Sequence, residues 1–148
     1  MTQVLEGKFI IGALEVCNLP ELSIYDLQVR IDTGAKTSSL HVDNLRRFTK
    51  SGRPWVRFDI HPDMYNVETV VECEAKISDI RNIKSSNGVA EERYVIRTLM
   101  EMGQHSWPIE LTLTNRSDMT FLMLLGREGM GKQVLVDPSE TFVLTTET

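Results

Sequence analysis

The sequence predicts an all-β fold, a barrel or a sandwich, that contains one short helix. Most of the chain alternates apolar and polar residues with a period of two, which is typical of strands that bury one face. The alternating segments are short and separated by turn residues, and the 3.6-residue period of an amphipathic helix is nearly absent. The clearest alternating segments are residues 27–32, 55–60, 67–77, 93–100 and 107–114.

Shorter patterns predict the remaining elements. Residues 120–125 form one apolar run, as expected of a strand that is covered on both faces. Two last short strands are expected at 133–137 and 141–144, on either side of Pro138. The single helix is expected directly after Gly126, over 127–130.

Two segments predict hairpin turns. Met102-Gly103-Gln104 lies between two alternating segments and indicates a tight hairpin loop. The stretch from Asp79 to Gly88 is polar and ends in an Asn-Gly turn signal. We therefore expect residues 79–88 to form the tip of a long, exposed hairpin between two strands.

Length and composition fit one domain, residues 1–148, which is long enough to bury a core without disulfides or a metal. The net charge of −5 predicts no nucleic-acid binding, since such proteins normally carry a basic face. Charged residues near the start argue against a secretion signal, and the lack of an apolar run of about 20 residues argues against a membrane segment. Cys17 and Cys73 match no metal spacing, so we expect reduced thiols and a cytoplasmic protein.

Asp32-Thr33-Gly34 is the first candidate for chemistry. A strand delivers the carboxylate of Asp32 to its end, Gly34 permits a tight turn, and the Thr33 hydroxyl can hold the loop by hydrogen bonds. Amide hydrolysis by carboxylates needs two of them close together, one protonated and one that activates water. The sequence holds no second copy of the motif, and the tripeptide alone also occurs as a plain turn.

Three segments follow one another along the chain: Asp32-Thr33-Gly34-Ala35, the hairpin around residues 85–88, and Leu124-Leu125-Gly126-Arg127-Glu128. This order resembles the retropepsin-like aspartic peptidases. In that family a strand ending in Asp-Thr-Gly-Ala pairs with a later hydrophobic-hydrophobic-Gly element, which opens the only helix, and a flap hairpin closes over the substrate. The resemblance implies a closed acid-protease barrel and a peptide-bond hydrolase. It assigns catalysis to Asp32, Thr33 and Gly34, and substrate binding to Ala35, Lys36, Asn87, Gly88 and Arg127.

A closer resemblance covers nearly the whole chain. The segments that carry it are residues 29–41, 70–73, 94–98, 107–110, 113–116 and 124–128. They are similar to the bacterial proteins named ATP-dependent zinc proteases, which belong to the retropepsin-like class. That group is associated with ATP-grasp ligases that add glutamates to proteins.

The residues themselves do not predict ATP or zinc. Residues 126–133 have the glycine and lysine spacing of a phosphate-binding loop, but Gln133 replaces the Ser or Thr that ligates magnesium, and a strand follows instead of a helix. His41, His61 and His105 have no paired spacing on one element. We expect no metal and no cofactor, although a site built in space from His41, His61 and an acid is an alternative.

One chain with one Asp-Thr-Gly implies, through the resemblance, a homodimer in which each copy supplies an Asp32. Arg127 is expected to pair with a carboxylate or a carbonyl beneath the active-site loop. Several cations near this loop and the presumed flap are either solvated surface charges or an electropositive cleft for glutamate-rich peptides. They are Arg30, Lys36, Arg81, Lys84 and Arg93. The alternatives to a peptidase are a peptide-binding module without catalysis and a zinc-dependent hydrolase.

Overall fold

The computed structural model describes residues 4–5, 7–62, 69–84, 88–115 and 121–144. Within this part the chain is mostly β-strand, which confirms the predicted class. The elements are β1 (Val4–Leu5), β2 (Lys8–Ile11), β3 (Leu14–Leu19), a 3-10 turn η1 (Pro20–Leu22), β4 (Ile24–Ile31), β5 (Ser39–His41), β6 (Asp43–Lys50), β7 (Arg53–Ile60), β8 (Val71–Lys76), β9 (Asp79–Lys84), β10 (Ala90–Met102), β11 (His105–Thr114), β12 (Met123–Leu125), α1 (Arg127–Met130) and β13 (Val134–Val136).

Six strands close into a barrel in the order β11-β5-β12-β4-β3-β10, and β10 pairs back onto β11. β12 runs parallel to β4, and β5 runs parallel to β11. The longest pair, β10–β11, turns at Gly103, which has a φ of 61°. The structure thus confirms the closed barrel and the hairpin loop at residues 102–104.

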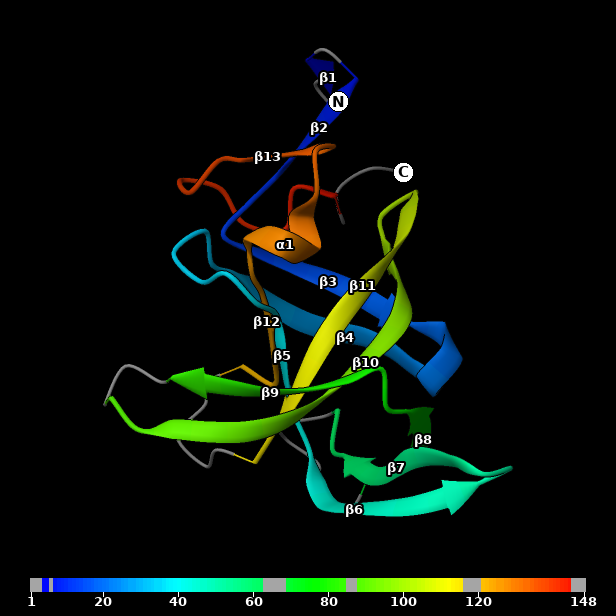
Figure 1. Cartoon of the computed structure of the whole chain (residues 1–148). Coiled ribbons are helices and arrows are strands. Elements are labelled where there is room, and N and C mark those ends of the chain that lie inside the picture. Colours follow the sequence, from blue (N-terminus) through cyan, green and yellow to red (C-terminus); the bar gives the residue numbers. More distant parts are fainter. Residues whose placement is uncertain (1–3, 6, 63–68, 85–87, 116–120, 145–148) are drawn as a thin grey trace.

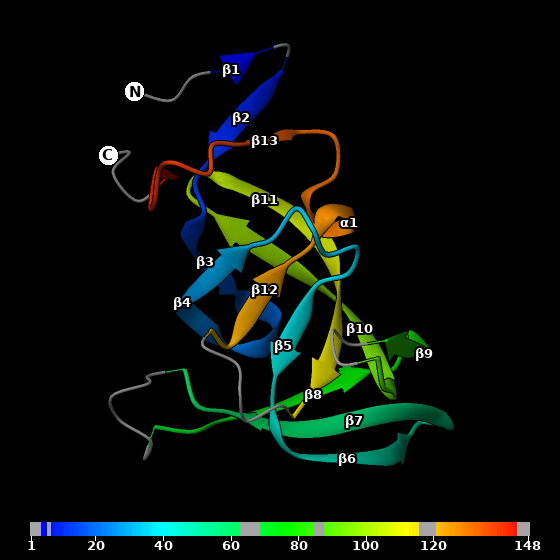
Figure 2. The ribbon, with the colours of Figure 1, turned by 90° about the vertical axis from the view of Figure 1, so that its left-hand side faces the viewer.

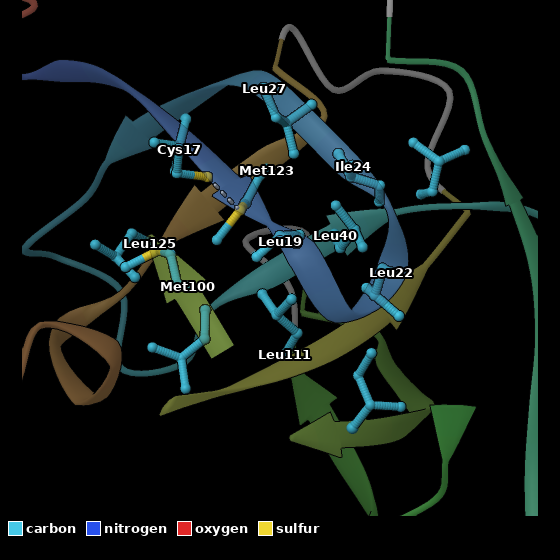
Figure 3. Packing of buried hydrophobic residues seen from close by; sticks show 14 of the residues in the cluster. Cys17, Leu19, Leu22, Ile24, Leu27, Leu40, Met100, Leu111, Met123 and Leu125 are labelled. Carbon is cyan, nitrogen blue, oxygen red and sulfur yellow. Dashed lines mark hydrogen bonds between the residues drawn. The ribbon is translucent and has the colours of Figure 1, made fainter. Parts of the chain in front are cut away.

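The barrel is filled by alternating apolar residues, as Figure 3 shows. Four strands, β3, β4, β5 and β11, each contribute a completely buried side chain. These are Leu19, Ile24, Leu40 and Leu111. Large-to-small changes at such positions cost about 2–5 kcal/mol because the cavity relaxes only in part. The Cys17 thiol lies in the same core and contacts the sulfur of Met123 at 3.6 Å.

Two smaller sheets lie at opposite ends of the barrel in Figures 1 and 2. At one end β2 pairs with β1 and, in parallel, with β13, so the beginning and the end of the described chain meet in one sheet. At the other end β6, β7 and β8 form an antiparallel sheet. Its inner face buries Val56, Phe58 and Ile60 completely.

The hairpin predicted between two strands is present, but its strands reach further than the sequence predicted. Residues 79–84, expected as part of the tip, form β9 and pair with β10 from Asp79↔Val95 to Lys84↔Ala90. Both faces of β9 remain largely polar and exposed, so its composition resembles a loop although its backbone is paired. The tip at 85–87 lies outside the described residues.

The end of the chain corrects another prediction. Residues 141–144 form a turn and not a strand. The fully buried carboxylate of Glu15 accepts hydrogen bonds from the backbone N–H groups of Val143 (2.9 Å) and Leu144 (3.2 Å), and from Gly12 (2.8 Å). A side chain therefore satisfies donors that a sheet partner would otherwise bind.

The apolar run at 120–125 also gives a shorter strand than predicted, because β12 begins only at Met123. The expected helix over 127–130 is confirmed as α1. No helix in the described part of the chain has the length and apolar character needed to cross a membrane.

Candidate active site

Asp32 follows the last residue of β4, and its loop is fastened to β12. The Asp32 N–H donates to the carbonyl of Leu125 at 3.0 Å, which continues the parallel pairing of β4 with β12. The Gly34 N–H donates to Asp32 Oδ1 at 2.9 Å, and the Ala35 N–H donates to the Asp32 carbonyl. A Cβ at residue 34 would lie 3.2 Å from Asp32 Oδ1, so glycine leaves the carboxylate room. The loop thus holds one carboxylate in a defined orientation.

The Gly126 turn braces the same loop from below. A Cβ at Gly126 would lie 2.4 Å from the Thr37 carbonyl oxygen, so the two backbones can approach this closely only at glycine. Arg127 makes two contacts, from its N–H to the Ala35 carbonyl and from Nη1 to the Thr33 carbonyl, both at 2.8 Å. Of the two partners expected for Arg127, a carboxylate or a carbonyl, the structure thus shows a carbonyl.

Buried polar side chains complete this support, and the sequence analysis missed them. Ser38 Oγ accepts the Gly126 N–H at 3.0 Å, while the Ser38 carbonyl accepts both the N–H and the hydroxyl of Thr112. Ser38 and Thr112 are each 2% exposed. A signal was present, since Ser38 shares its period-two face with Leu40 and Val42, and both of these are fully buried.

A cleft of about 840 Å³ separates the Asp32 loop from the β9–β10 hairpin. Gly34, Ala35 and Lys36 form part of one wall, and the hairpin forms the other. The described lining residues are Gly34, Ala35, Lys36, Thr37, Ser39, Arg81, Asn82, Ile83, Lys84, Arg93, Leu124 and Glu128. Four of these side chains are cationic and one is acidic, so the cleft is electropositive in a chain whose net charge is −5.

Ion pairs hold the cleft cations in place. Arg81 contacts Asp79 at 2.8 Å and Glu110 on the barrel wall at 2.9 Å, and the hydrogen bond from Arg81 holds the pKa of the Asp79 carboxyl below its ordinary value. Arg93 lies directly opposite Arg81 in the β9–β10 register, is only 6% exposed, and contacts Glu91 at 3.0 Å. Two like charges at one cross-strand position are unfavourable unless each has an acidic partner.

A smaller pocket of about 130 Å³ adjoins the cleft. Arg81, Thr37 and Glu128 line both spaces, whereas Arg97 and Glu110 line the pocket but not the cleft. Arg81 therefore stands where the cleft opens into a side pocket of polar character.

The structure divides the sequence-predicted site residues into groups. Gly34, Ala35 and Lys36 line the cleft, while Asp32 is half-buried and Thr33 is exposed at the loop beside it. Asn87 lies outside the described residues. Of the remaining predicted binding residues, Gly88 is exposed and Arg127 contacts the loop backbone, but neither is among the described residues that line the cleft. Arg30 is exposed on β4 and is likewise not among the described residues that line the cleft.

The segment that resembles a phosphate-binding loop uses its amides internally. The N–H of Gly126 binds Ser38 Oγ, that of Arg127 binds the Ala35 carbonyl, and that of Glu128 binds the Lys36 carbonyl. Such loops hold phosphate through free backbone N–H groups, whereas the first four amides of this segment, at residues 126–129, are already bonded within the protein. The chain then enters β13, as the sequence indicated.

His41 and His61, the two histidines of the alternative metal site, do approach a common acid. Their Nε2 atoms lie 3.7 and 3.4 Å from different oxygens of Asp43. One carboxylate thus bridges two imidazoles, whereas zinc ligands converge on one point about 2 Å from each donor. In the described ranges, no group of three or more His, Cys, Asp or Glu side chains is arranged to hold a metal ion.

The family of the chain is shown by a match over most of its length. A family model described as "RimB-like: Retropepsin-like aspartic endopeptidase RimB" matches residues 10–147. The chain belongs to this RimB-like family. The match supports the retropepsin-like superfamily to which the Asp32 and Gly126 segments pointed.

Relatives of this chain carry a different name from the one that the sequence resemblance suggested. Proteins named "Probable alpha-L-glutamate ligase" are 50% identical to this chain over 139 residues in Shewanella halifaxensis and 47% identical over 133 residues in Desulfotalea psychrophila. These matches cover 94% and 90% of this chain but only 30% and 29% of the relatives. The chain therefore spans less than a third of the length of the curated relatives it matches.

A solved structure has the same fold. The crystal structure of Lpg0085, a protein of unknown function from Legionella pneumophila, matches with a TM-score of 0.75 and 27% sequence identity. The match covers 91% of this chain and 97% of the Legionella chain.

Proposed function

We propose that this chain is an aspartic peptidase that acts as a homodimer, in which two copies of Asp32 form the catalytic pair. The observation that carries the proposal is the Asp32 loop, which is held by β12 and Arg127 at the edge of a cleft beneath the β9–β10 hairpin. Membership of a retropepsin-like endopeptidase family supports the same reaction class.

In the proposed mechanism the two Asp32 carboxyl groups share one proton, since like charges that close cannot both ionise. The ionised carboxylate takes a proton from water as its oxygen attacks the peptide carbonyl carbon. The protonated carboxyl gives its proton to the carbonyl oxygen. The carbon–nitrogen bond then breaks as the amine nitrogen receives a proton from the first carboxyl group. One hydroxyl of the diol intermediate returns its proton to the second carboxylate, which yields the product acid and restores the single shared proton.

A second copy is needed because the sequence holds one Asp-Thr-Gly. Thr33 and Gly34 are exposed in the single chain and are thus available to pack against an identical loop across a two-fold axis. The Gly34 N–H donates to Oδ1 of Asp32 within the loop, so the other oxygen of the carboxylate is left to bind water.

We propose glutamate-rich peptides as the substrates. Lys36, Arg81, Lys84 and Arg93 line the cleft against the single acid Glu128, so an acidic peptide meets complementary charge. Lys36 and Glu128 are exposed and 3.7 Å apart, and a substrate carboxylate can replace so weak a partner. The name of the relatives, a glutamate ligase, joins glutamate chemistry to this domain and supports the same substrate class.

The central test is subunit mixing with Asp32→Asn. We expect the variant to be inactive. After subunit exchange in an equimolar mixture, about a quarter of all dimers should be wild type, so the activity should fall to about half of its value before exchange. Asp26→Asn, at an exposed aspartate on the same strand, serves as the matched control and should leave activity unchanged. Full activity in Asp32→Asn, or an active monomer in sedimentation, would overturn the mechanism.

Two further arms separate the alternatives. We expect an aspartic-peptidase inhibitor to abolish peptide hydrolysis and a chelator to leave it unchanged. Loss of hydrolysis with the chelator alone would favour the zinc hydrolase. Peptide binding without cleavage under every condition would favour the binding module.

Substrate preference is tested by Arg81→Gln. This change should raise KM for a glutamate-rich peptide and leave a neutral peptide unaffected, whereas Arg30→Gln, outside the described cleft lining, should change neither. Equal cleavage of acidic and neutral peptides by the wild type would refute the preference.

A further inference from the structure

The sheet of β6, β7 and β8 carries a face that the peptidase proposal does not use. Residues opposite one another in antiparallel strands share a face, so the register defines its rows. One row joins Phe48, Trp55 and Lys76, and the next joins Arg46, Arg57 and Glu74. Because Val56 and Phe58 point to the buried side, these two rows form the outer face.

Two aromatic side chains lie in the middle of this outer face. Phe48 and Trp55 are directly opposite each other, with ring centroids 6.5 Å apart, and both are only half-buried. Lys50 Nζ lies 4.6 Å from the Trp55 ring, and the Arg57 guanidinium lies 4.7 Å from the Phe48 ring. Aromatic faces at the surface are here interleaved with cations.

Charge is segregated along the strands. The end of the sheet near the β6–β7 turn carries five cations, and the only described acid in these rows is Glu74, which Arg57 and Lys50 already bind. The cations are Arg46, Lys50, Arg53, Arg57 and Lys76. Asp59 and Glu72 pair at the opposite end of the sheet. The net charge of −5 is a sum over the whole chain, and this part of the surface is nevertheless strongly basic and aromatic.

We propose that this surface, the basic–aromatic face of β6–β8, binds single-stranded nucleic acid. Proteins that bind single strands combine cations along the phosphate backbone with aromatic rings on which bases stack, and an open sheet is one scaffold for such rings. Acidic peptides would match the cations, but the side chains of Asp and Glu have no aromatic ring to stack on Phe48 and Trp55. The two aromatic rings therefore favour a nucleic acid over an acidic protein.

The site is distinct from the Asp32 cleft, because none of its residues is among those lining the cleft. It is also compatible with the ion pairs already present. Lys50 and Glu74 are 3.4 Å apart with exposed side chains, so phosphate can displace the carboxylate at small cost. Lys50 can then leave the Trp55 ring and expose it to a base.

The test measures binding of labelled oligouridine and oligothymidine of about ten nucleotides by fluorescence anisotropy, from about 50 to 200 mM salt. Each cation that contacts phosphate should contribute about 0.7 to the slope of log affinity against log salt. Lys50→Ala with Arg53→Ala should therefore flatten the slope by about 1.4 and weaken binding about tenfold near 100 mM salt. Lys8→Ala with Lys132→Ala removes the same charge elsewhere and should leave the slope unchanged.

Stacking is tested at Trp55. Trp55→Phe keeps an aromatic face, whereas Trp55→Leu keeps only apolar bulk and should weaken binding about tenfold. Thermal unfolding verifies that both variants fold. Tighter binding of oligouridine identifies RNA as the ligand, and tighter binding of oligothymidine identifies DNA.

Four results would overturn the proposal. They are no binding at about 50 mM salt, equal losses in the two charge-matched double variants, equal affinity of the Phe and Leu variants, and competition by a glutamate polymer as strong as by oligonucleotide. The last result would mark the surface as a docking site for acidic proteins. None of these measurements depends on peptidase activity.

Discussion

Removing the Ser38 hydroxyl tests how the Asp32 loop is supported. In Ser38→Ala the backbone N–H of Gly126 loses its acceptor, which lies 3.0 Å away in the native protein. Gly126 and Ser38 are both buried, so water does not readily replace the lost oxygen. An orphaned buried donor costs about 1–3 kcal/mol, and we expect the free energy of unfolding to fall by about 2 kcal/mol.

The matched control is the neighbouring Ser39→Ala. Ser39 is half-buried and lines the cleft, and its removal should change stability by less than about 0.5 kcal/mol. Urea unfolding of both variants, with equal m-values, gives the difference directly. Because the backbone carbonyl of Ser38 still binds Thr112, any loss reports the hydroxyl alone. A Ser38→Ala protein as stable as Ser39→Ala would refute the assigned support.

Three further predictions concern other buried or bracing groups. Glu15→Gln should lower stability by about 2 kcal/mol or more, because an amide cannot accept all three N–H donors, whereas Glu101→Gln, with one long contact to Asn18, should be near neutral in thermal unfolding. Burial raises the pKa of Cys17 to about 12, so on raising the pH the thiol ionises in the unfolded chain before it ionises in the folded protein. The contribution of this thiol to the free energy of unfolding should therefore be full below about pH 9 and decline toward pH 12. In Cys17→Ala, urea unfolding at a series of pH values should no longer show this decline. Arg127→Gln should lower kcat more than it raises KM, since Arg127 holds the Thr33 carbonyl and is not among the described residues lining the cleft, and an effect on KM alone would contradict this.

The alternating pattern predicted the strands that bury one face. β7 and the β10–β11 hairpin follow the expected segments closely, since their apolar positions repeat every second residue. β9 and residues 141–144 were predicted wrongly for different reasons. β9 pairs with the next strand, β10, but its polar and exposed residues lack the alternation that marks a strand. The backbone partner of residues 143–144 is the side chain of Glu15, which is distant in sequence and which composition does not reveal.

The order of the functional segments is a property of the sequence alone. A carboxylate at a strand end, a glycine after it, and a later Gly-Arg turn are local features, and their order indicates the retropepsin-like fold. The structure adds the physical reason for Gly126, because only glycine permits the close approach of the Thr37 carbonyl.

Only the tertiary structure decided which charges act together. Lys36 is far from Arg81 and Arg93 in sequence, and the β9–β10 register and the Asp32 loop bring all three to one cleft. The same holds for Phe48 and Trp55, whose shared outer face follows from the pairing of β6 with β7. Electrostatic fields and stacking surfaces depend on distance in space, and the net charge of a chain carries no information about that distance.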